Sequence, residues 1–181
     1  MVKGLPMHTS LQKIFSEMED QRLSLLGQIK NLSTEALNQS PTPGAWSLAQ
    51  VFSHIITSER LTVNYVAKKF QAAETLDNSG VREEIKSILL MMTQRFPGVK
   101  FRAPKAIVEK TVAFGSYVEI DQAWAVVRLE LKSFLDAYPE KYLRRKVARH
   151  PFAGYLNIVQ GVSFLRDHIT HHTPQIMKLI R

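Results

Sequence analysis

Cysteine is absent from the 181-residue sequence. Its absence excludes disulfides, thiolate zinc sites and cysteine nucleophiles, so any metal would be bound through nitrogen and oxygen atoms. It also fits a reducing compartment, and we expect a cytoplasmic protein. Long apolar runs are missing as well, since stretches such as Ile88 to Met92 are far shorter than the roughly 20 residues of a membrane span. The N-terminal residues MVKGLPMHTS lack the apolar core of a signal peptide, and we expect no membrane association.

Repeats, low-complexity segments and linkers are also lacking, and we expect a single domain over residues 1–181. Hydrophobic residues make up 45% of the chain and charged residues 22%, which is ordinary for a globular protein with a buried core. The formal net charge is +8, and the densest basic run extends from Lys141 to Arg149. No RNA-type aromatic motif or glycine clamp accompanies this run. We therefore interpret it as a solvated basic surface and expect no specific nucleic-acid partner.

Apolar residues recur at three- and four-residue steps along four segments, and this periodicity predicts amphipathic helices. A shorter helix at about residues 82–95 and an irregular segment at 99–116 separate the second and third long helices. The four periodic segments predict an all-α, up-down four-helix bundle, and the short helix and the irregular segment are additions between its second and third helices. The long helices are predicted at about residues 9–31, 47–75, 120–137 and 154–180.

Several residues mark the expected helix boundaries. Ser47 and Gln50 fit a capping box, in which each side chain satisfies an open backbone N–H in the first turn of the second long helix. The breakers Pro41 and Gly44 precede it. Pro174 lies inside the last predicted helix, and we expect a kink there, with a tolerated irregularity near the helix end as the alternative.

Three of the six histidines crowd into the sequence DHITHH of the last helix. His168 and His172 are four residues apart, so they lie on one helix face, one turn apart. Zinc protease helices present two imidazoles to one metal at this spacing, but the glutamate of their motif is missing, because Ile169 follows His168. A zinc protease is therefore disfavoured. His171 falls at the edge of the apolar stripe, and we expect it to support the ligands rather than to coordinate.

His54, on the second long helix, is the candidate for a third ligand. Its neighbours on the same helix face are mostly apolar, so we expect its imidazole to point into the core. A lone histidine on an apolar face is usually a satisfied core residue. Here, however, three buried imidazoles would be costly unless something satisfied their nitrogens. We predict that His54, His168 and His172 bind one divalent metal.

Other residues are expected near this site, although no general base is apparent and the catalytic residues stay unassigned. Ser58 and Tyr65 share the face of His54 and could line a pocket, with core packing as the alternative for Tyr65. Gln175 lies close to the direction of the histidine pair. It is expected either to contact a ligand or to support a helix–helix contact.

Four further residues are expected to have structural roles. Glu59 is about 140° from His54 around the helix, which predicts a surface or interhelix contact. Trp46 and Trp124 are predicted to anchor the core, and His150 is expected to brace the bundle from the loop before the last helix.

Two segments resemble motifs of the DinB/YfiT-like family of metal-dependent proteins. GAWSLAQVFSHIITSE, at residues 44–59, resembles the family's Trp-Ser…His…Glu helix. HPFAGYLNIVQGVSFLRDHITHHTPQI, at residues 150–176, resembles its closing segment, with a His-Pro, a glycine, HxxxH and a Gln-Ile. The resemblance covers the whole chain in helix order. It implies a four-helix bundle with a three-histidine site at His54, His168 and His172, where nickel or zinc is the typical metal.

The resemblance also implies a range of functions. Characterised relatives include thiol-dependent transferases and isomerases that use low-molecular-weight thiols, and dimers are common among them. It therefore implies a metal-dependent enzyme, a thiol-dependent transferase or a hydrolase, with a small thiol as partner and a homodimer as assembly. The chain departs from the plainest members at residues 80–116, which are longer, partly basic and able to reshape the pocket. The alternatives are a non-catalytic metal or small-ligand binding stress protein and a nucleic-acid binder.

Overall fold

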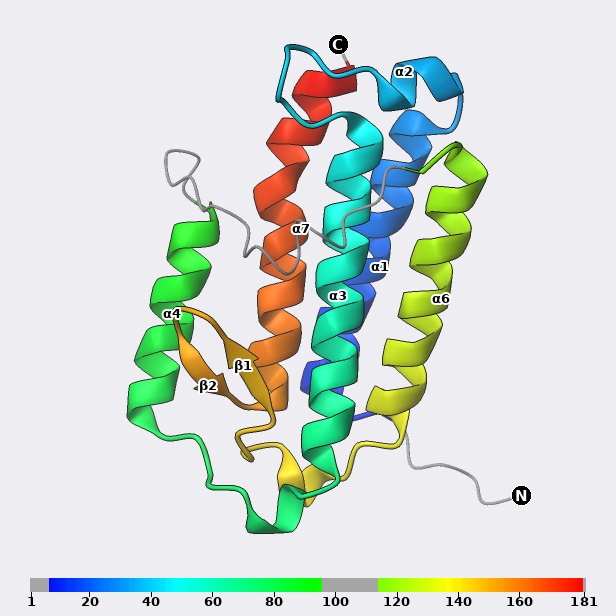
Figure 1. Ribbon diagram of the computed structural model, residues 1–181. Coiled ribbons are helices and arrows are strands. Elements are labelled where there is room, and N and C mark those ends of the chain that lie inside the picture. Colours follow the sequence, from blue (N-terminus) through cyan, green and yellow to red (C-terminus); the bar gives the residue numbers. More distant parts are fainter. Residues whose placement is uncertain (1–6, 96–113, 181) are drawn as a thin grey trace, which may run out of the picture.

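Four long helices form a bundle in the computed structural model, which describes residues 7–95 and 114–180 (Figure 1). Two of these helices, α1 and α7, run in one direction, and α3 and α6 run in the other. A fifth helix, α4, lies outside the bundle against α7 and runs in the same direction as α7, so α3 and α6 can run parallel to each other. The predicted all-α bundle with an extra helix is confirmed. The bounds are α1 Thr9–Ile29, α3 Leu48–Phe70, α4 Val81–Arg95, α6 Tyr117–Asp136 and α7 Ile158–Ile180.

Shorter elements close the ends of the bundle. Two strands, β1 and β2, form an antiparallel hairpin beside α4 and α7, with Ala148 paired to Leu156. Most of the irregular segment expected at residues 99–116 lies outside the described residues. The minor elements are α2 Thr34–Asn38, 3₁₀ turns at Ala73–Thr75 and Glu140–Tyr142, β1 Ala148–His150 and β2 Gly154–Leu156.

The capping box at the start of α3 is confirmed. The Ser47 hydroxyl oxygen accepts a hydrogen bond from the Gln50 backbone N–H at 3.3 Å, and the Gln50 side-chain oxygen accepts one from the Ser47 N–H at 2.9 Å. The other end of this helix was predicted too late, because α3 ends at Phe70 and a 3₁₀ turn follows. The short helix α2 was not predicted at all. Ser33 caps it by accepting from the backbone N–H of Ala36.

The start of α7 was also predicted wrongly, at Gly154 or Tyr155. The residues before Ile158 pair as a β-hairpin instead, and Gly154 takes a positive φ of 79° that favours glycine in this turn. The Asn157 side chain then caps α7 by accepting from the Gln160 N–H at 2.9 Å, and the Gln160 side chain accepts from the Asn157 N–H at 3.0 Å. Strand pairing and this cap therefore set where α7 begins.

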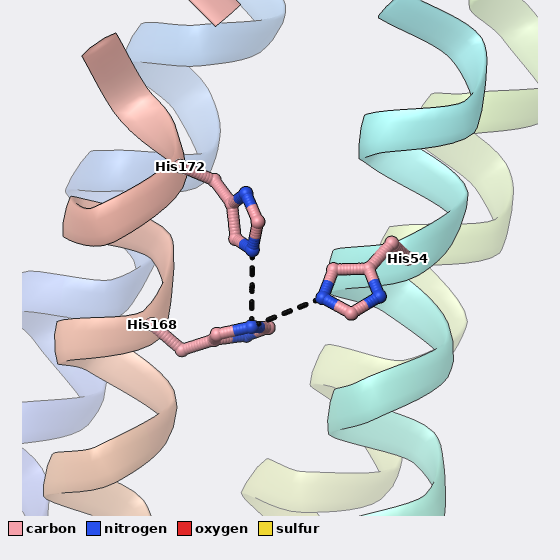
Figure 2. A group of neighbouring side chains, drawn as sticks. All are labelled: His54, His168 and His172. Atoms are coloured by element: carbon pink, nitrogen blue, oxygen red, sulfur yellow. Dashed lines mark hydrogen bonds between the residues drawn. The ribbon is translucent and has the colours of Figure 1, made fainter. Parts of the chain in front are cut away.

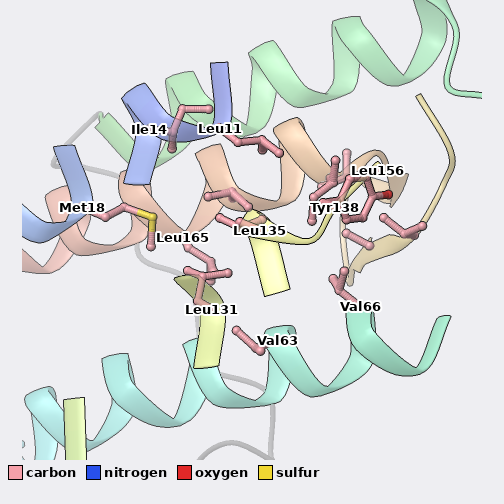
Figure 3. Close-up of a cluster of buried hydrophobic side chains, with 14 of the residues drawn as sticks. Leu11, Ile14, Met18, Val63, Val66, Leu131, Leu135, Tyr138, Leu156 and Leu165 are labelled. Atoms are coloured by element: carbon pink, nitrogen blue, oxygen red, sulfur yellow. The ribbon is translucent and has the colours of Figure 1, made fainter. Parts of the chain in front are cut away.

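The hydrophobic core consists of two clusters stacked along the bundle. The first cluster fills the half of the bundle near α2 and contains Trp124. Trp124 is 0% exposed, which confirms its predicted role as a core anchor. The second fills the opposite half (Figure 3). Gly161 lets β1 approach α7, because an added Cβ there would lie 2.8 Å from the Cβ of Ala148. The second cluster includes Leu11, Ile14, Met18, Val63, Val66, Leu131, Leu135, Tyr138, Leu156 and Leu165.

A buried ionic contact joins α3 to α6. Of the two predicted environments for Glu59, the structure shows the interhelix contact, because the residue is 0% exposed. Its carboxylate accepts hydrogen bonds from the Trp124 indole N–H at 3.1 Å and from the Arg128 guanidinium at 2.9 Å. Burial raises the pKa of Glu59, while Arg128 and the Trp124 hydrogen bond act in the opposite direction.

Candidate metal centre

The structure brings His54, His168 and His172 together between α3 and α7 (Figure 2). The Nε2 atom of His168 lies 3.2 Å from Nε2 of His54 and 3.2 Å from Nε2 of His172. Each ring offers one nitrogen atom to the site, and these three nitrogen atoms all lie within 4.8 Å of one another. We call these three residues the histidine triad. A metal ion could be held by the triad.

Two local features position the triad. His168 and His172 lie on consecutive turns of α7, which remains helical through Pro174. His54 lies near the capped N-terminus of α3, and it reaches the α7 pair across 114 positions of sequence. His54 is 5% exposed and His168 is 8% exposed, whereas His172 lies at the partly exposed edge.

All three imidazoles are held in the neutral form. Burial lowers the pKa of His54 to about 4, with repulsion from His172 and His171 adding to the shift. Burial is also the largest cause that lowers the pKa of His172 to about 4, against the Gln175 hydrogen bond that raises it. The pKa of His168 is lowered well below its usual value by burial and by the neighbouring imidazoles. Near pH 7 each ring therefore keeps a nitrogen lone pair for coordination.

The donor set fits a divalent cation. Two imidazole nitrogens at about 2.05 Å from a tetrahedral zinc lie about 3.3 Å apart, close to the two 3.2 Å separations. Within the described residues, Nδ1 of His54 and Nδ1 of His168 are buried and have no hydrogen-bond partner. A neutral imidazole carries one N–H and one lone pair, so rings that meet only one another leave polar atoms unsatisfied. A cation at the three Nε2 atoms uses the lone pairs there and places the ring protons on Nδ1, so among the described residues it accounts for the Nε2 contacts and not for the unpartnered Nδ1 atoms.

Gln175 orients the third ring of the triad. Its side-chain oxygen lies 2.9 Å from Nδ1 of His172. An amide oxygen can only accept, so this contact places the His172 proton on Nδ1 and leaves the Nε2 lone pair aimed at His168. Of the two roles predicted for Gln175, ligand contact and helix support, the structure shows neither directly. It shows instead that Gln175 fixes an imidazole of the triad.

Aromatic rings enclose the triad on two sides. The ring of Trp46 lies 5.0 Å from that of His54, so Trp46 adjoins the site rather than serving only as a core anchor. Phe164 stacks on His168 at 5.6 Å, and the buried His150 lies 4.5 Å beyond Phe164. Sequence reasoning missed Phe164, although its position four residues before His168 places both on one helix face. Trp46 precedes α3, so no helical periodicity could have placed it.

The remaining candidate residues lie around the triad. His171 points towards α4, where its Nδ1 is 3.1 Å from the Gln94 backbone oxygen, and its ring lies 5.1 Å from that of His172. Ser58 is buried one turn after His54 on α3, and Tyr65 is partly exposed further along. In the described part of the chain, neither hydroxyl forms a hydrogen bond with the triad. Their predicted place in a pocket stays a prediction.

The basic run from Lys141 to Arg149 is engaged within the fold. Lys146 forms an ion pair with Glu83 at 3.2 Å, and Lys141 approaches Glu74 at 3.8 Å. These contacts tie the run to the first turn of α4 and to the segment that joins α3 to α4. The other partners are backbone oxygens of Ser79 and Leu76 for Arg144 and Arg145, and the ring of Tyr155 for Arg149.

Comparison with known proteins places the sequence in a family. A profile of the DinB superfamily matches residues 17–176, a range that includes all three triad histidines. The chain belongs to the DinB superfamily. This agrees with the resemblance of its two motif segments and with the helical bundle that carries them.

One curated relative of this DinB superfamily chain is the uncharacterized protein YuaE of Bacillus subtilis (strain 168). The two are 26% identical over 166 residues, which cover 92% of this chain and 94% of YuaE. No solved structure matches the chain significantly. None of the helices in the described ranges has the length and apolar character needed to cross a membrane.

Proposed function

We propose that this DinB superfamily protein is a metal-dependent enzyme in which His54, His168 and His172 bind one divalent cation, nickel or zinc. We further propose that a low-molecular-weight thiol occupies an open position beside them, in a transferase or, alternatively, a hydrolase reaction. The convergence of the three Nε2 atoms carries the proposal. Sites with three protein ligands are typical of catalytic rather than structural metals, because they keep a position open. The homodimer and the cytoplasmic location stay predictions.

The charge of the site favours an anionic partner. Burial shifts the pKa values of the three triad histidines. The side chains that shift them further are neighbouring imidazoles and the Gln175 amide, and none of these is a carboxylate. Three neutral ligands leave the charge of a divalent cation uncompensated. A cation bound there would act as a Lewis acid and lower the pKa of a coordinated thiol or water. A thiolate fits this charge better than a neutral ligand does.

The chain itself would orient and shield the reacting groups. Gln175 holds the His172 ring in the tautomer that can coordinate. Trp46 and Phe164 cover His54 and His168 with apolar rings, which restricts water on those sides. The partly exposed edge at His172 is the side from which a small thiol would enter.

A second candidate is a non-catalytic metal or small-ligand binding protein. Glu59 is the buried carboxylate closest in sequence to His54, and it is occupied by Arg128 and Trp124. It therefore cannot serve as a general base without breaking a buried ion pair. Metal binding without turnover on any thiol substrate would support this second candidate over the enzyme.

The test begins with metal content. Protein purified without a metal-affinity tag should contain close to one nickel or zinc per chain by plasma mass spectrometry. Structural zinc sites bind with about 10–16 kcal/mol over four ligands, so one ligand contributes about 2.5–4 kcal/mol. His168→Ala should therefore weaken binding by about 100- to 1,000-fold. His171→Ala is the matched control and should change affinity by less than about tenfold, because its Nδ1 contacts the Gln94 backbone oxygen rather than a triad nitrogen.

Thiol binding is tested on the cobalt-substituted protein. A thiolate that enters the metal's open position should add a sulfur-to-metal charge-transfer band, and thiol-transfer assays should then follow metal content. Equal metal affinity in the parent and His168→Ala would overturn the metal site. A cobalt spectrum unchanged by every thiol would overturn the thiol partner and leave the metal site standing.

A further inference from the structure

The outward face of α4 is apolar and exposed. This helix lies at the edge of the molecule against α7, where its inner face is covered and Leu90 is 7% exposed (Figure 1). The opposite face carries five large apolar side chains that are each between 45% and 77% exposed, namely Val81, Ile85, Ile88, Leu89 and Met92. A helix that is apolar on both faces is normally buried on both, and exposed apolar patches of this kind mark interaction sites. We therefore expect a partner to cover this face.

The spacing of these residues identifies the kind of partner. Four of them follow one another at steps of four, three and four positions, namely Val81, Ile85, Ile88 and Met92. We call these four residues the α4 seam. Steps of three and four in alternation form the a/d repeat of a coiled coil, which packs its apolar seam against another helix with the same repeat. The partner that fits the α4 seam is therefore a second amphipathic helix.

The α4 seam is complementary to itself. A two-fold axis brings one surface patch against the same patch of a second copy. The order of steps four, three and four is the same in both directions, so two antiparallel copies of α4 bring every seam residue against another seam residue. Val81 then lies opposite Met92 of the second copy, and Ile85 lies opposite Ile88 of the second copy.

The charges on α4 permit this pairing, although the whole chain has a net charge of +8. The seam itself is uncharged, and exposed charges of opposite sign lie on its two flanks, Arg82 on one and Glu84 on the other. In an antiparallel pair each flank faces the same flank of the second copy, but at the other end of the helix. Arg82 therefore lies near Leu89 of the second copy, and Glu84 lies near Met91 of the second copy. No like charges meet across the contact.

We propose that the α4 seam binds the α4 seam of a second copy of this chain, antiparallel about a two-fold axis. This gives the predicted homodimer a surface and an orientation, and it uses no atom of the histidine triad. A standard interface buries about 800 Å² on each partner over about 20–30 residues. The seam and its flanks are smaller than that, so the dimer forms at micromolar rather than nanomolar concentrations.

Sedimentation equilibrium of the full chain tests the contact. The parent should show a monomer–dimer equilibrium, and Ile85→Glu should raise its dissociation constant by about 100-fold or more, because a carboxylate then enters the apolar seam. Leu129→Glu is the matched control on the exposed surface of α6 and should dimerise like the parent. Metal content should be equal in the parent and Ile85→Glu, so loss of the dimer is distinguishable from failure of the metal site. A parent that stays monomeric, or equal dissociation constants in the parent and Ile85→Glu, would overturn the proposal.

Two mixing experiments test the antiparallel orientation. Ile85→Glu chains mixed with Ile88→Lys chains should associate more tightly than either variant alone, because the two opposite charges meet in the mixed dimer. The chain has no cysteine of its own, so introduced cysteines form the disulfides without competition. Val81→Cys chains oxidised together with Met92→Cys chains should give mainly the mixed disulfide. A product dominated by the two homodisulfides, or no gain on mixing the charged variants, would refute the antiparallel seam.

Discussion

Acidifying the metal-free protein should destabilise it through the triad. Burial lowers the pKa of His54 to about 4, whereas an unfolded chain restores a value near 6.5. A histidine with a lowered folded-state pKa stabilises the protein fully above its unfolded pKa, and that stability is lost as the pH falls. Between pH 7 and pH 5 the unfolded state gains a proton that the folded state does not. The linkage relation then gives a loss of about 2 kcal/mol from His54 alone.

The other triad histidines act in the same direction, and Glu59 acts in the opposite one. The pKa values of His168 and His172 are lowered as well, but charged imidazoles repel one another, so the three losses do not simply add. Burial raises the pKa of Glu59, which stabilises the folded state as the pH falls. The pH dependence of the unfolding free energy of the parent protein therefore combines a loss from the histidines with a gain from Glu59 as the pH falls. The difference between a parent protein and a His54 variant isolates the imidazole.

The assay is urea unfolding followed by circular dichroism at pH 7, 6 and 5, with a chelator present. From pH 7 to pH 5, the unfolding free energy of His54→Gln should fall by about 2 kcal/mol less than that of the parent. Gln122→Leu, on the exposed surface of α6, is the control and should keep the parent's pH dependence. Equal pH dependence in His54→Gln and the parent, or a steeper loss in the variant, would refute the reasoning that His54 is buried and neutral.

Three further predictions test the fold and the basic surface. Glu59→Gln should lower the unfolding free energy by about 3 kcal/mol, because Arg128 stays buried and keeps only its longer ion pair with Glu19, at 3.5 Å; chemical denaturation measures this, and adding Arg128→Met should recover part of the loss. Gly161→Ala should cost about 1–3 kcal/mol, because its Cβ meets Ala148 at 2.8 Å, and Ala148→Gly in the same chain should restore the melting temperature. Fluorescence anisotropy should detect no sequence-selective DNA binding at physiological salt, since the basic run is engaged within the fold, and tight selective binding would contradict that interpretation.

Local chemistry determined the parts of the site that lie on one helix. The four-residue spacing of His168 and His172 fixes their common face whatever the rest of the chain does, because a helix turns about 100° per residue. The capping box of Ser47 and Gln50 is likewise a local hydrogen-bond exchange. The same helical geometry placed His171 at the edge of the apolar stripe, away from the direction of His168 and His172. These features could be predicted because each depends on neighbours within about one helical turn.

Other features were predicted wrongly, left open or missed because a non-local partner decides them. The apolar residues before α7 suit a helix or a strand, and only the pairing of β1 with β2 makes them a hairpin. The sequence left Glu59 with either a surface or an interhelix position. Its hydrogen bond with Arg128, 69 positions away in the sequence, places it between helices. Trp46 and Phe164 adjoin the triad through tertiary packing, which a helical wheel of one segment does not contain.

The sequence by itself determined an all-α chain, the pair of imidazoles on α7 and an inward-facing His54. Only the tertiary structure decided that His54 Nε2 lies 3.2 Å from His168 Nε2, and that α4 packs one face on α7 and leaves its other apolar face exposed. The physical reason is the range of the forces involved. Helical periodicity and caps act within a few residues, whereas the approach of α3 and α4 to α7 depends on the burial of many side chains at once.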